Sequence, residues 1–268
     1  MANPGPLLLT GAAGALGQYL RPHLAKRPSG LRSSDIRDPG KPHASEEIVV
    51  GDLGDAALVD RIVKGACAIV HLGAIATEDA IDKIFHANFH GTYHVFESAL
   101  RHGVKRIVFA SSNHAIGYHP VTDRLDALSR QRPDTMYGVS KAFGENLGSF
   151  LADKFGLEVA CLRIGSALPE PKEPRHLATW LSYPDLLRLV TACLDAPKLH
   201  FTIVYGVSDN SRSYWDNSKS GIDYRPLDSA DRYAAQILSH GDPRDPADPT
   251  TRFQGGPYVK LGLGEKPT

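Results

Sequence analysis

Short apolar segments alternate with longer amphipathic segments over the first 163 residues of the chain. The amphipathic segments carry apolar residues three or four positions apart, as Leu16, Leu20 and Leu24 do, which is the spacing of one helix face. The short apolar runs are typical of strands that are buried on both faces. The pattern predicts strands at residues 7–10, 31–34, 47–50, 68–72, 106–111 and 158–163, and helices at residues 16–25, 56–63, 80–102 and 135–154. This alternation predicts an α/β fold, with a parallel sheet covered by helices on both sides.

The alternation ends after Arg163, where the chain becomes rich in proline. Prolines at positions 169, 171, 174 and 184 predict irregular backbone, followed by a helix at residues 184–195 and one more strand at 201–205. Aspartate and proline dominate residues 242–249, so we expect no regular element there and a course over the surface. We predict one structural domain with two parts. Residues 1–163 would form a sheet region that binds a cofactor, and residues 164–268 a smaller substrate-binding lobe with a C-terminal tail.

Composition narrows the classes of function. The chain has 268 residues, enough to bury one core, and its 30 basic and 30 acidic residues balance to no net charge. Balanced charge argues against nucleic acid or an anionic membrane as partner, so a small molecule is the expected ligand. The chain lacks an apolar run of the ~18 residues that a membrane span needs, and its first five residues do not resemble a secretory signal, so we expect a cytoplasmic protein. Histidine and cysteine spacings predict no metal site.

A glycine-rich turn links the first predicted strand to the first predicted helix. The segment Thr-Gly-Ala-Ala-Gly-Ala-Leu-Gly at residues 10–17 places glycines at positions 11, 14 and 17. Glycines at this spacing let the backbone turn tightly, let a pyrophosphate approach the amide groups, and let the helix pack closely on the strand. Because the turn lies between a strand and an amphipathic helix, it predicts a dinucleotide site, with an ordinary turn as the alternative. The residues of this predicted site are Gly11, Ala13, Gly14, Ala15, Leu16 and Gly17.

Two acidic residues that follow later strands bear on the identity of the dinucleotide. Asp35 follows the second strand, where a carboxylate accepts hydrogen bonds from the ribose hydroxyls and repels a 2′-phosphate. It predicts NAD, against Arg32 and Arg37, either of which could pair with the phosphate of NADP. Asp52 follows the third strand, and two interpretations of it are equally supported: a contact to the adenine, or a cap for the next helix.

Tyr137 and Lys141 form the candidate catalytic pair. They lie four residues apart in a predicted helix, so their side chains share one face. A lysine ammonium ~5 Å from a phenol stabilises the phenolate by roughly 3 kcal/mol at an effective dielectric of ~20, which would bring a tyrosine pKa of ~10 towards neutrality. The pair therefore predicts a general base, with an exposed helix face as the alternative. Ser111 and Ser112 end the preceding strand and would place a hydroxyl beside this base.

Several motifs together resemble the extended short-chain dehydrogenase/reductase family, whose fold is a Rossmann-type doubly wound sheet. They are Thr-Gly-x-x-Gly-x-x-Gly at residues 10–17, Tyr-x-x-x-Lys at 137–141, Asn-Phe-His-Gly-Thr at 88–92, and Ala-Ser-Ser at 110–112. Other segments are similar to those members of the family that oxidise hexuronic acids; they lie at residues 109–118, 162–166, 169–171, 179–180, 215–218 and 252–256. The resemblance implies oxidation of D-glucuronate or D-galacturonate at C1 by NAD, giving an aldarolactone, in a homo-oligomer.

The resemblance also implies roles for individual residues. The catalytic residues would be Ser112, Tyr137 and Lys141. Beyond the glycine-rich turn, Asp35 and Asp52, the implied cofactor contacts are Leu53, Leu72, Gly73, Ala74, Asn88, Tyr137, Lys141 and Ile164. The implied substrate contacts are Ala76, Thr77, Ser112, Asn113, His114, Tyr137, Ser166, Arg175 and Phe253. Arg175 suits the substrate carboxylate because its planar fork donates two parallel hydrogen bonds, whereas the alternative is a solvated loop charge. For His114 the alternative is a core histidine bonded to backbone.

One segment departs from the family pattern. Where the family usually has a second glycine and then a serine that reaches the sugar, this chain has Ala74 and Ala76. The missing hydroxyl is supplied by Thr77 or is absent, so preference between glucuronate and galacturonate stays open.

Other functions also remain as alternatives. A nucleotide-sugar epimerase or dehydratase, or another aldose dehydrogenase, would use the same cofactor site and tyrosine. Only 105 residues follow Arg163, few to enclose a nucleotide diphosphate, and residues 112–114 lack the carboxylates that elimination of water requires. A regulatory protein that only senses NAD would tend to lose its catalytic serine, tyrosine or lysine, and this chain has all three.

Overall fold

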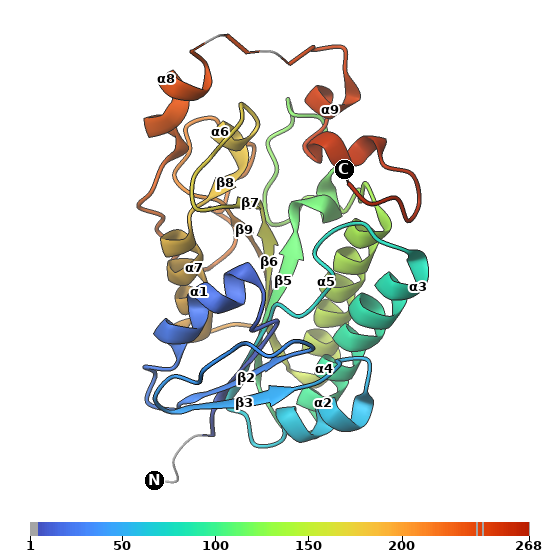
Figure 1. Ribbon diagram of the computed structural model, residues 1–268, viewed down its shortest axis with the longest axis vertical. Helices are drawn as coiled ribbons and strands as arrows, with labels where there is room; N and C mark the ends of the chain where they lie inside the picture. Colours follow the sequence, from blue (N-terminus) through green and yellow to red (C-terminus); the bar gives the residue numbers. More distant parts are fainter. Residues whose placement is uncertain (1–4, 240, 243, 268) are drawn as a thin grey trace.

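A seven-stranded parallel sheet with helices on both faces forms the centre of the protein, which confirms the predicted fold class (Figure 1). The computed structural model describes residues 5–239, 241–242 and 244–267, and its strand order is β3-β2-β1-β4-β5-β6-β9. These strands are β1 (Leu7–Thr10), β2 (Leu31–Asp35), β3 (Glu46–Val50), β4 (Ala68–His71), β5 (Arg106–Ser112), β6 (Glu158–Ile164) and β9 (Phe201–Gly206). The strand order reverses between β1 and β4, and in such sheets ligands bind beyond the carboxyl ends of the strands at that reversal.

Two layers of helices cover the sheet. One face carries α1 (Ala15–Leu24) and α7 (Tyr183–Asp195), and the other carries α2 (Ala56–Val63), α4 (Gly91–Arg101) and α5 (Met136–Phe155) (Figure 1). In β1, Leu7 and Leu9 pack into the core on the α1 side and Leu8 into the core on the opposite side, and none is more than 1% exposed. Burial of both faces explains why the strands are continuous apolar runs in the sequence. No helix in the described ranges is long and apolar enough to cross a membrane.

The shorter elements depart from the sequence prediction. The single helix expected over residues 80–102 is α3 (Ile81–Ile84), a π-helical turn (Phe85–His90) and α4 in succession. The tail forms α9 (Pro249–Arg252), so the prediction of no regular element over 242–249 is wrong at its last residue. Proline is tolerated in the first turn of a helix, and the Asp248 carboxylate caps α9 by accepting from Thr250 N at 2.8 Å. The remaining short elements are α6 (His176–Thr179), α8 (Ala234–Ile237), the strand pair β7 (Ser166–Ala167) and β8 (Trp180–Leu181), and three 3-10 helices at Asn113–Ile116, Ala230–Tyr233 and Gly256–Lys260.

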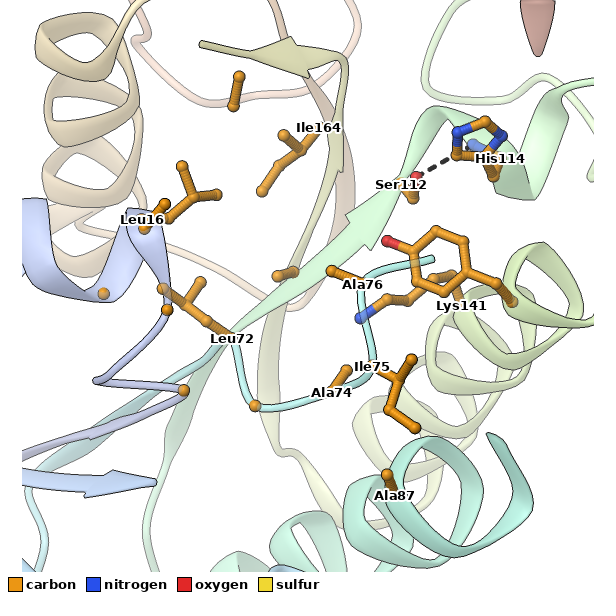
Figure 2. Close-up of a pocket in the computed structure, with 18 of the residues that line it drawn as sticks. Leu16, Leu72, Ala74, Ile75, Ala76, Ala87, Ser112, His114, Lys141 and Ile164 are labelled. Atoms are coloured by element: carbon orange, nitrogen blue, oxygen red, sulfur yellow. Dashed lines mark hydrogen bonds between the residues drawn. The ribbon is translucent and has the colours of Figure 1, made fainter. Parts of the chain in front are cut away.

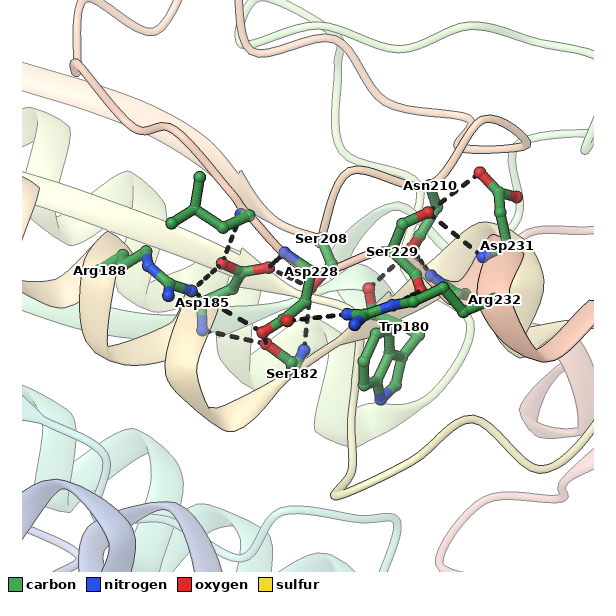
Figure 3. A network of polar contacts seen from close by, with 12 residues as sticks. Trp180, Ser182, Asp185, Arg188, Ser208, Asn210, Asp228, Ser229, Asp231 and Arg232 are labelled. Atoms are coloured by element: carbon green, nitrogen blue, oxygen red, sulfur yellow. Dashed lines mark hydrogen bonds and ion pairs between the residues drawn. The ribbon is translucent and has the colours of Figure 1, made fainter.

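The predicted division at residue 163 does not separate the sheet, because β9 pairs with β6 along its whole length. The rest of the lobe is held to α7 by a buried polar network centred on Asp185 (Figure 3). The Asp185 carboxylate accepts from Ser208 Oγ at 2.6 Å, and from the backbone N–H groups of Leu227 at 2.9 Å and Asp228 at 3.1 Å. A fully buried carboxylate with this many donors stabilises the lobe only when all of them are in place.

Candidate active site

The described residues enclose a pocket of about 970 Å³ beyond the carboxyl ends of β1, β4, β5 and β6. This volume is at the upper end of small-molecule sites, as a dinucleotide together with a second substrate would require. Figure 2 shows Leu16 and Leu72 on one side of the pocket and Ser112, His114 and Lys141 on the other. The site therefore has a nucleotide end, at the glycine-rich turn, and a substrate end, at the start of α5.

The glycine-rich turn forms a cradle that fits a pyrophosphate. Gly11 has φ +74°, and a Cβ at this position would lie 2.7 Å from the backbone N of Gly73, after β4. A Cβ at Gly17 would lie 2.2 Å from the Gly11 carbonyl oxygen, so this glycine allows α1 to pack against the turn. No side chain caps α1, whose N-cap residue is Gly14. The first amide groups of α1 remain available to an anion in the pocket.

Asp35 lies at the edge of the nucleotide end, where the sequence placed it. Its Oδ2 accepts from Ala13 N at 2.9 Å and its Oδ1 from Arg37 N at 3.0 Å, so the carboxylate is fixed while lone pairs remain for ribose hydroxyls. Arg32 lies away from the pocket and pairs with Glu47 at 2.7 Å. Of these two arginines only Arg37 lines the pocket; its side chain is 72% exposed and lies 4.0 Å from the Asp35 carboxylate.

Asp52 lines the pocket and does not cap a helix. Its carboxylate accepts from Gly54 N at 2.8 Å and lies 2.9 Å from Nε2 of His86. The cap of α2 is Asp55, which accepts from Ala57 N at 2.9 Å. Of the two interpretations of Asp52, the helix cap is therefore wrong, and the adenine contact remains a proposal.

Ser112, Tyr137 and Lys141 lie together at the point where the two ends meet, while Ser111 is committed elsewhere. Tyr137 and Lys141 are 7% and 4% exposed, so the alternative of an exposed helix face is wrong. Lys141 Nζ lies 5.6 Å from the centre of the Tyr137 ring. Both serines line the pocket, but the Ser111 hydroxyl donates to Glu145 at 2.6 Å, whereas the Ser112 hydroxyl lies beside Tyr137. The structure thus selects Ser112 from the serine pair.

Burial reverses the expected effect of Lys141 on the tyrosine. It raises the pKa of Tyr137 to about 12, although the neighbouring Ser112 hydroxyl opposes part of this rise. It also lowers the pKa of Lys141 to about 7. The prediction of a phenol acidified by this lysine is wrong for these side chains alone, because desolvation, the largest cause of both pKa shifts, disfavours the charged form of each group. A phenolate near neutral pH needs further positive charge in the pocket.

Arg175 provides a half-buried guanidinium at the substrate end, and its Nε atom is fully buried without a hydrogen-bond partner in the described residues. It donates to Ser166 Oγ at 3.1 Å and to the Gln254 carbonyl at 2.9 Å, and the Asn113 amide accepts from it at 3.0 Å in the orientation that also satisfies Ile164 O. Burial lowers its pKa. Within the described ranges no carboxylate lies within ion-pair distance of Arg175, and Lys141 also has none. Two such cations in one pocket favour an anionic ligand.

His114 is held by a carboxylate that the sequence analysis missed. Its Nδ1 lies 2.8 Å from Asp134 Oδ2, its ring stacks on Tyr258 at 4.0 Å between centres, and it lines the pocket. The alternative of a core histidine bonded to backbone is therefore wrong. Asp134 comes from the loop before α5 and Tyr258 from the last residues of the chain, so no local motif could have identified either.

Four residues expected to contact a ligand lie outside the pocket lining: Ala13, Thr77, Asn88 and Phe253. The Asn88 amide is fully used, since it bonds both backbone groups of Ile75 and the Ser140 hydroxyl. Thr77 Oγ1 bonds Tyr258 at 2.9 Å, and Phe253 packs against Tyr118. The lining also includes residues that the sequence analysis did not name, among them Lys83, His86, His176 and Tyr258. In the described part of the chain, no group of three histidine, cysteine or acidic residues is placed to hold a metal ion.

Comparisons with known proteins give a consistent relationship. Residues 7–182 match the NAD dependent epimerase/dehydratase family. The chain is 45% identical to a uronate dehydrogenase of Pseudomonas syringae pv. tomato over 97% of this chain and 95% of that protein. The crystal structure of glucuronic acid dehydrogenase from Chromohalobacter salexigens is similar with a TM-score of 0.94 and 46% identity, covering 97% and 98% of the two chains. A mutant uronate dehydrogenase from Agrobacterium tumefaciens, complexed with NAD, is similar with a TM-score of 0.92 and 44% identity, covering 98% and 99%.

Proposed function

The chain belongs to the NAD dependent epimerase/dehydratase family, alongside the uronate dehydrogenases, and from this premise we propose that it oxidises a hexuronic acid at C1 with NAD. The observation that carries the proposal is Arg175, a half-buried guanidinium with a fully buried, unpartnered Nε and no carboxylate partner in the described residues. It lies in the same pocket as Ser112, Tyr137 and Lys141. A uronate carboxylate supplies the missing anion. A neutral aldose would leave the guanidinium without its charge partner, at a cost of roughly 1–3 kcal/mol.

The residues at the nucleotide end suit NAD. The amide groups at the start of α1 would hold the pyrophosphate, Asp35 would accept from the ribose hydroxyls, and Asp52 would contact the adenine. Asp35 also disfavours NADP, since its carboxylate would repel a 2′-phosphate. When bound, NAD supplies the acceptor for the hydride from C1 and a positively charged nicotinamide ring.

Tyr137 is the general base of the proposed reaction. Its phenolate takes the proton from the C1 hydroxyl as the C1–H bond gives up its hydride, so C1 becomes a carbonyl while the ring oxygen stays attached, and the product is a lactone. Ser112 donates to the reacting oxygen and fixes its position. Lys141 would hold the nicotinamide ribose, and its charge would add to that of the bound ring in stabilising the phenolate. Together these charges offset the burial that raises the pKa of Tyr137 to about 12.

The loop after β4 bears on the choice between uronates. Ala76 lines the pocket without a hydroxyl, and the Thr77 hydroxyl is engaged with Tyr258 at 2.9 Å. The hydroxyl that the resemblance places here is therefore not replaced by Thr77. We infer that the enzyme accepts both glucuronate and galacturonate, because one hydrogen bond that would discriminate between them is missing.

Purified protein mixed with NAD and either glucuronate, galacturonate, glucose or UDP-glucose tests the proposal, with the absorbance of reduced cofactor as readout. We expect both uronates to react, and glucose to react with a kcat/KM at least ~10-fold lower. Equal kcat/KM for glucose and glucuronate would contradict the role of Arg175. Reduction with UDP-glucose alone would indicate a nucleotide-sugar enzyme, and tight NAD binding without any turnover would indicate a sensor.

A further inference from the structure

Three consecutive residues of the loop before α3 hold the last part of the chain. We call residues 256–266 the C-terminal strap; it is red in Figure 1 and lies near the N-terminal end of α5. Thr77 bonds the hydroxyl of Tyr258 at 2.9 Å, and Glu78 accepts from Gly264 N at 3.0 Å. Asp79 pairs with Lys266 at 3.0 Å. The strap is thus attached to the loop residue by residue.

Glu78 differs from its two neighbours because it also contacts the catalytic helix. It is completely buried, and while its Oε1 accepts from the strap, its Oε2 accepts from the backbone N–H of Tyr137 at 2.8 Å. This N–H belongs to the first turn of α5, where backbone donors have no partner within the helix. Thr135 caps the next free donor, Gly138 N, at 3.0 Å. The Glu78 carboxylate completes the capping of α5 at the residue that carries the reacting phenol.

The strap reaches the substrate end of the pocket as well. Tyr258 stacks on His114. Gly256 has φ +63° and packs so closely on Arg175 that a Cβ would lie 2.5 Å from Nε of the guanidinium. The strap therefore contacts both His114 and Arg175, and Glu78 links the strap to the backbone of Tyr137.

We propose that Glu78 is a positioning residue of the oxidation, which sets the place of the Tyr137 phenol relative to the substrate held under the strap. This inference rests on the proposed function. Both oxygens of Glu78 are occupied, one by each partner, so a change in either contact displaces the other. Misplacement of a catalytic group by ~1 Å can lower turnover by ~100-fold, which makes such a link visible in kcat.

The test compares Glu78→Gln with the matched control Asp79→Asn, using NAD and the faster of the two uronates. Gln keeps the shape of Glu, but its amide nitrogen faces one of the two N–H donors, so one acceptor is lost. We expect kcat of Glu78→Gln to fall at least ~10-fold while KM for the uronate and the Kd for NAD stay within ~3-fold. Asp79→Asn, which touches the strap but not Tyr137, should keep kcat within ~2-fold.

Two further measurements separate positioning from a general loss of structure. In a Tyr137→Phe background, Glu78→Gln should cause little additional loss, since residues that act through one step are not additive. If Glu78→Gln does not fold, Glu78→Asp keeps the charge but cannot span both donors, and should show a smaller fall in kcat with unchanged NAD affinity. Wild-type kcat in a folded Glu78 variant overturns the inference. A wild-type enzyme that is inactive with every uronate overturns the proposed function instead.

Discussion

The two ends of the pocket are built in different ways. The nucleotide end is formed by strand–turn–helix units that are local in sequence, and its main groups are backbone amides and the carboxylates of Asp35 and Asp52. The substrate end combines β5, the loop after β6 and the C-terminal strap, and its main groups are side chains, such as Arg175 and His114. The contacts of Asp35 and Asp52 at the first end join segments within 40 residues of each other, whereas at the second end Tyr258 contacts His114 and Thr77, both more than a hundred residues earlier in the chain.

This difference indicates which end of the pocket binds the pyrophosphate and which end selects the substrate. A cradle of backbone amides suits any pyrophosphate, since it makes few demands on the rest of the ligand. Buried, unpaired side-chain charges suit only a ligand that supplies the opposite charge at the right place. We therefore expect changes at the nucleotide end to affect the cofactor alone and changes at the substrate end to affect the sugar alone. Only the residues where the two ends meet should affect turnover without changing the affinity for cofactor or sugar.

The largest effect is expected where the two ends meet. Tyr137→Phe removes the phenol and leaves the ring, so turnover of uronate should fall at least ~100-fold, which is the usual contribution of a general base. NAD affinity, measured by titration of protein fluorescence, should be unchanged. Turnover close to wild type would show that the base is another group.

A smaller effect, confined to the substrate end, is expected from Arg175→Lys. Lysine keeps the charge but lacks the planar fork, so kcat/KM for uronate should fall roughly 10- to 100-fold, while the Kd for NAD stays within ~2-fold. Residual activity with glucose serves as the control, because a neutral sugar does not use this contact. A parallel loss with glucose and uronate would mean that Arg175 supports the fold of the site and not the carboxylate.

Asp35→Asn tests the nucleotide end with a more modest expected effect. Loss of the negative charge should raise kcat/KM for NADP relative to NAD about 10-fold, since repulsion of the 2′-phosphate is removed while Arg37 remains close. The KM for uronate should not change. A large shift in that KM would show that the two ends are coupled through the sheet, contrary to the comparison above.

The smallest expected effect is on the free energy of unfolding, and it is measured with Lys141→Met. The folded-state pKa of about 7 lies below the ~10.4 of a free lysine, so between these values the unfolded chain binds the proton more strongly and stability increases with pH. The cost of burying this cation is complete below the folded-state pKa. The Met variant should therefore be more stable than wild type at pH 6, and this advantage should shrink by roughly 1–3 kcal/mol at pH 9. Urea unfolding at the two pH values measures the difference, and an advantage independent of pH would contradict a buried, titrating Lys141.

The fold was largely predictable from the sequence, and the substrate end of the site only in part. Strands at residues 7–10 and 158–163 were predicted to within one residue at each end, because their apolar runs report burial on both faces. The single helix over 80–102 was not resolved into its three pieces, because one π-helical turn of six residues is too short to give a distinct pattern in the sequence. Asp134, Tyr258 and Glu78 carry no local pattern, so only their contacts identify them.

The amino-acid sequence by itself determined the α/β class, the glycine-rich cradle with Asp35 behind it, and the Tyr137–Lys141 pair on one helix face. Each of these depends on the order and spacing of residues along the chain, which helix and strand geometry converts into proximity. The tertiary structure decided which serine hydroxyl is taken up by Glu145, which aspartate caps α2, and that burial raises the pKa of Tyr137 and lowers that of Lys141. The physical reason is that desolvation and long-range hydrogen bonds depend on every segment that packs around a group, and no stretch of sequence contains them all.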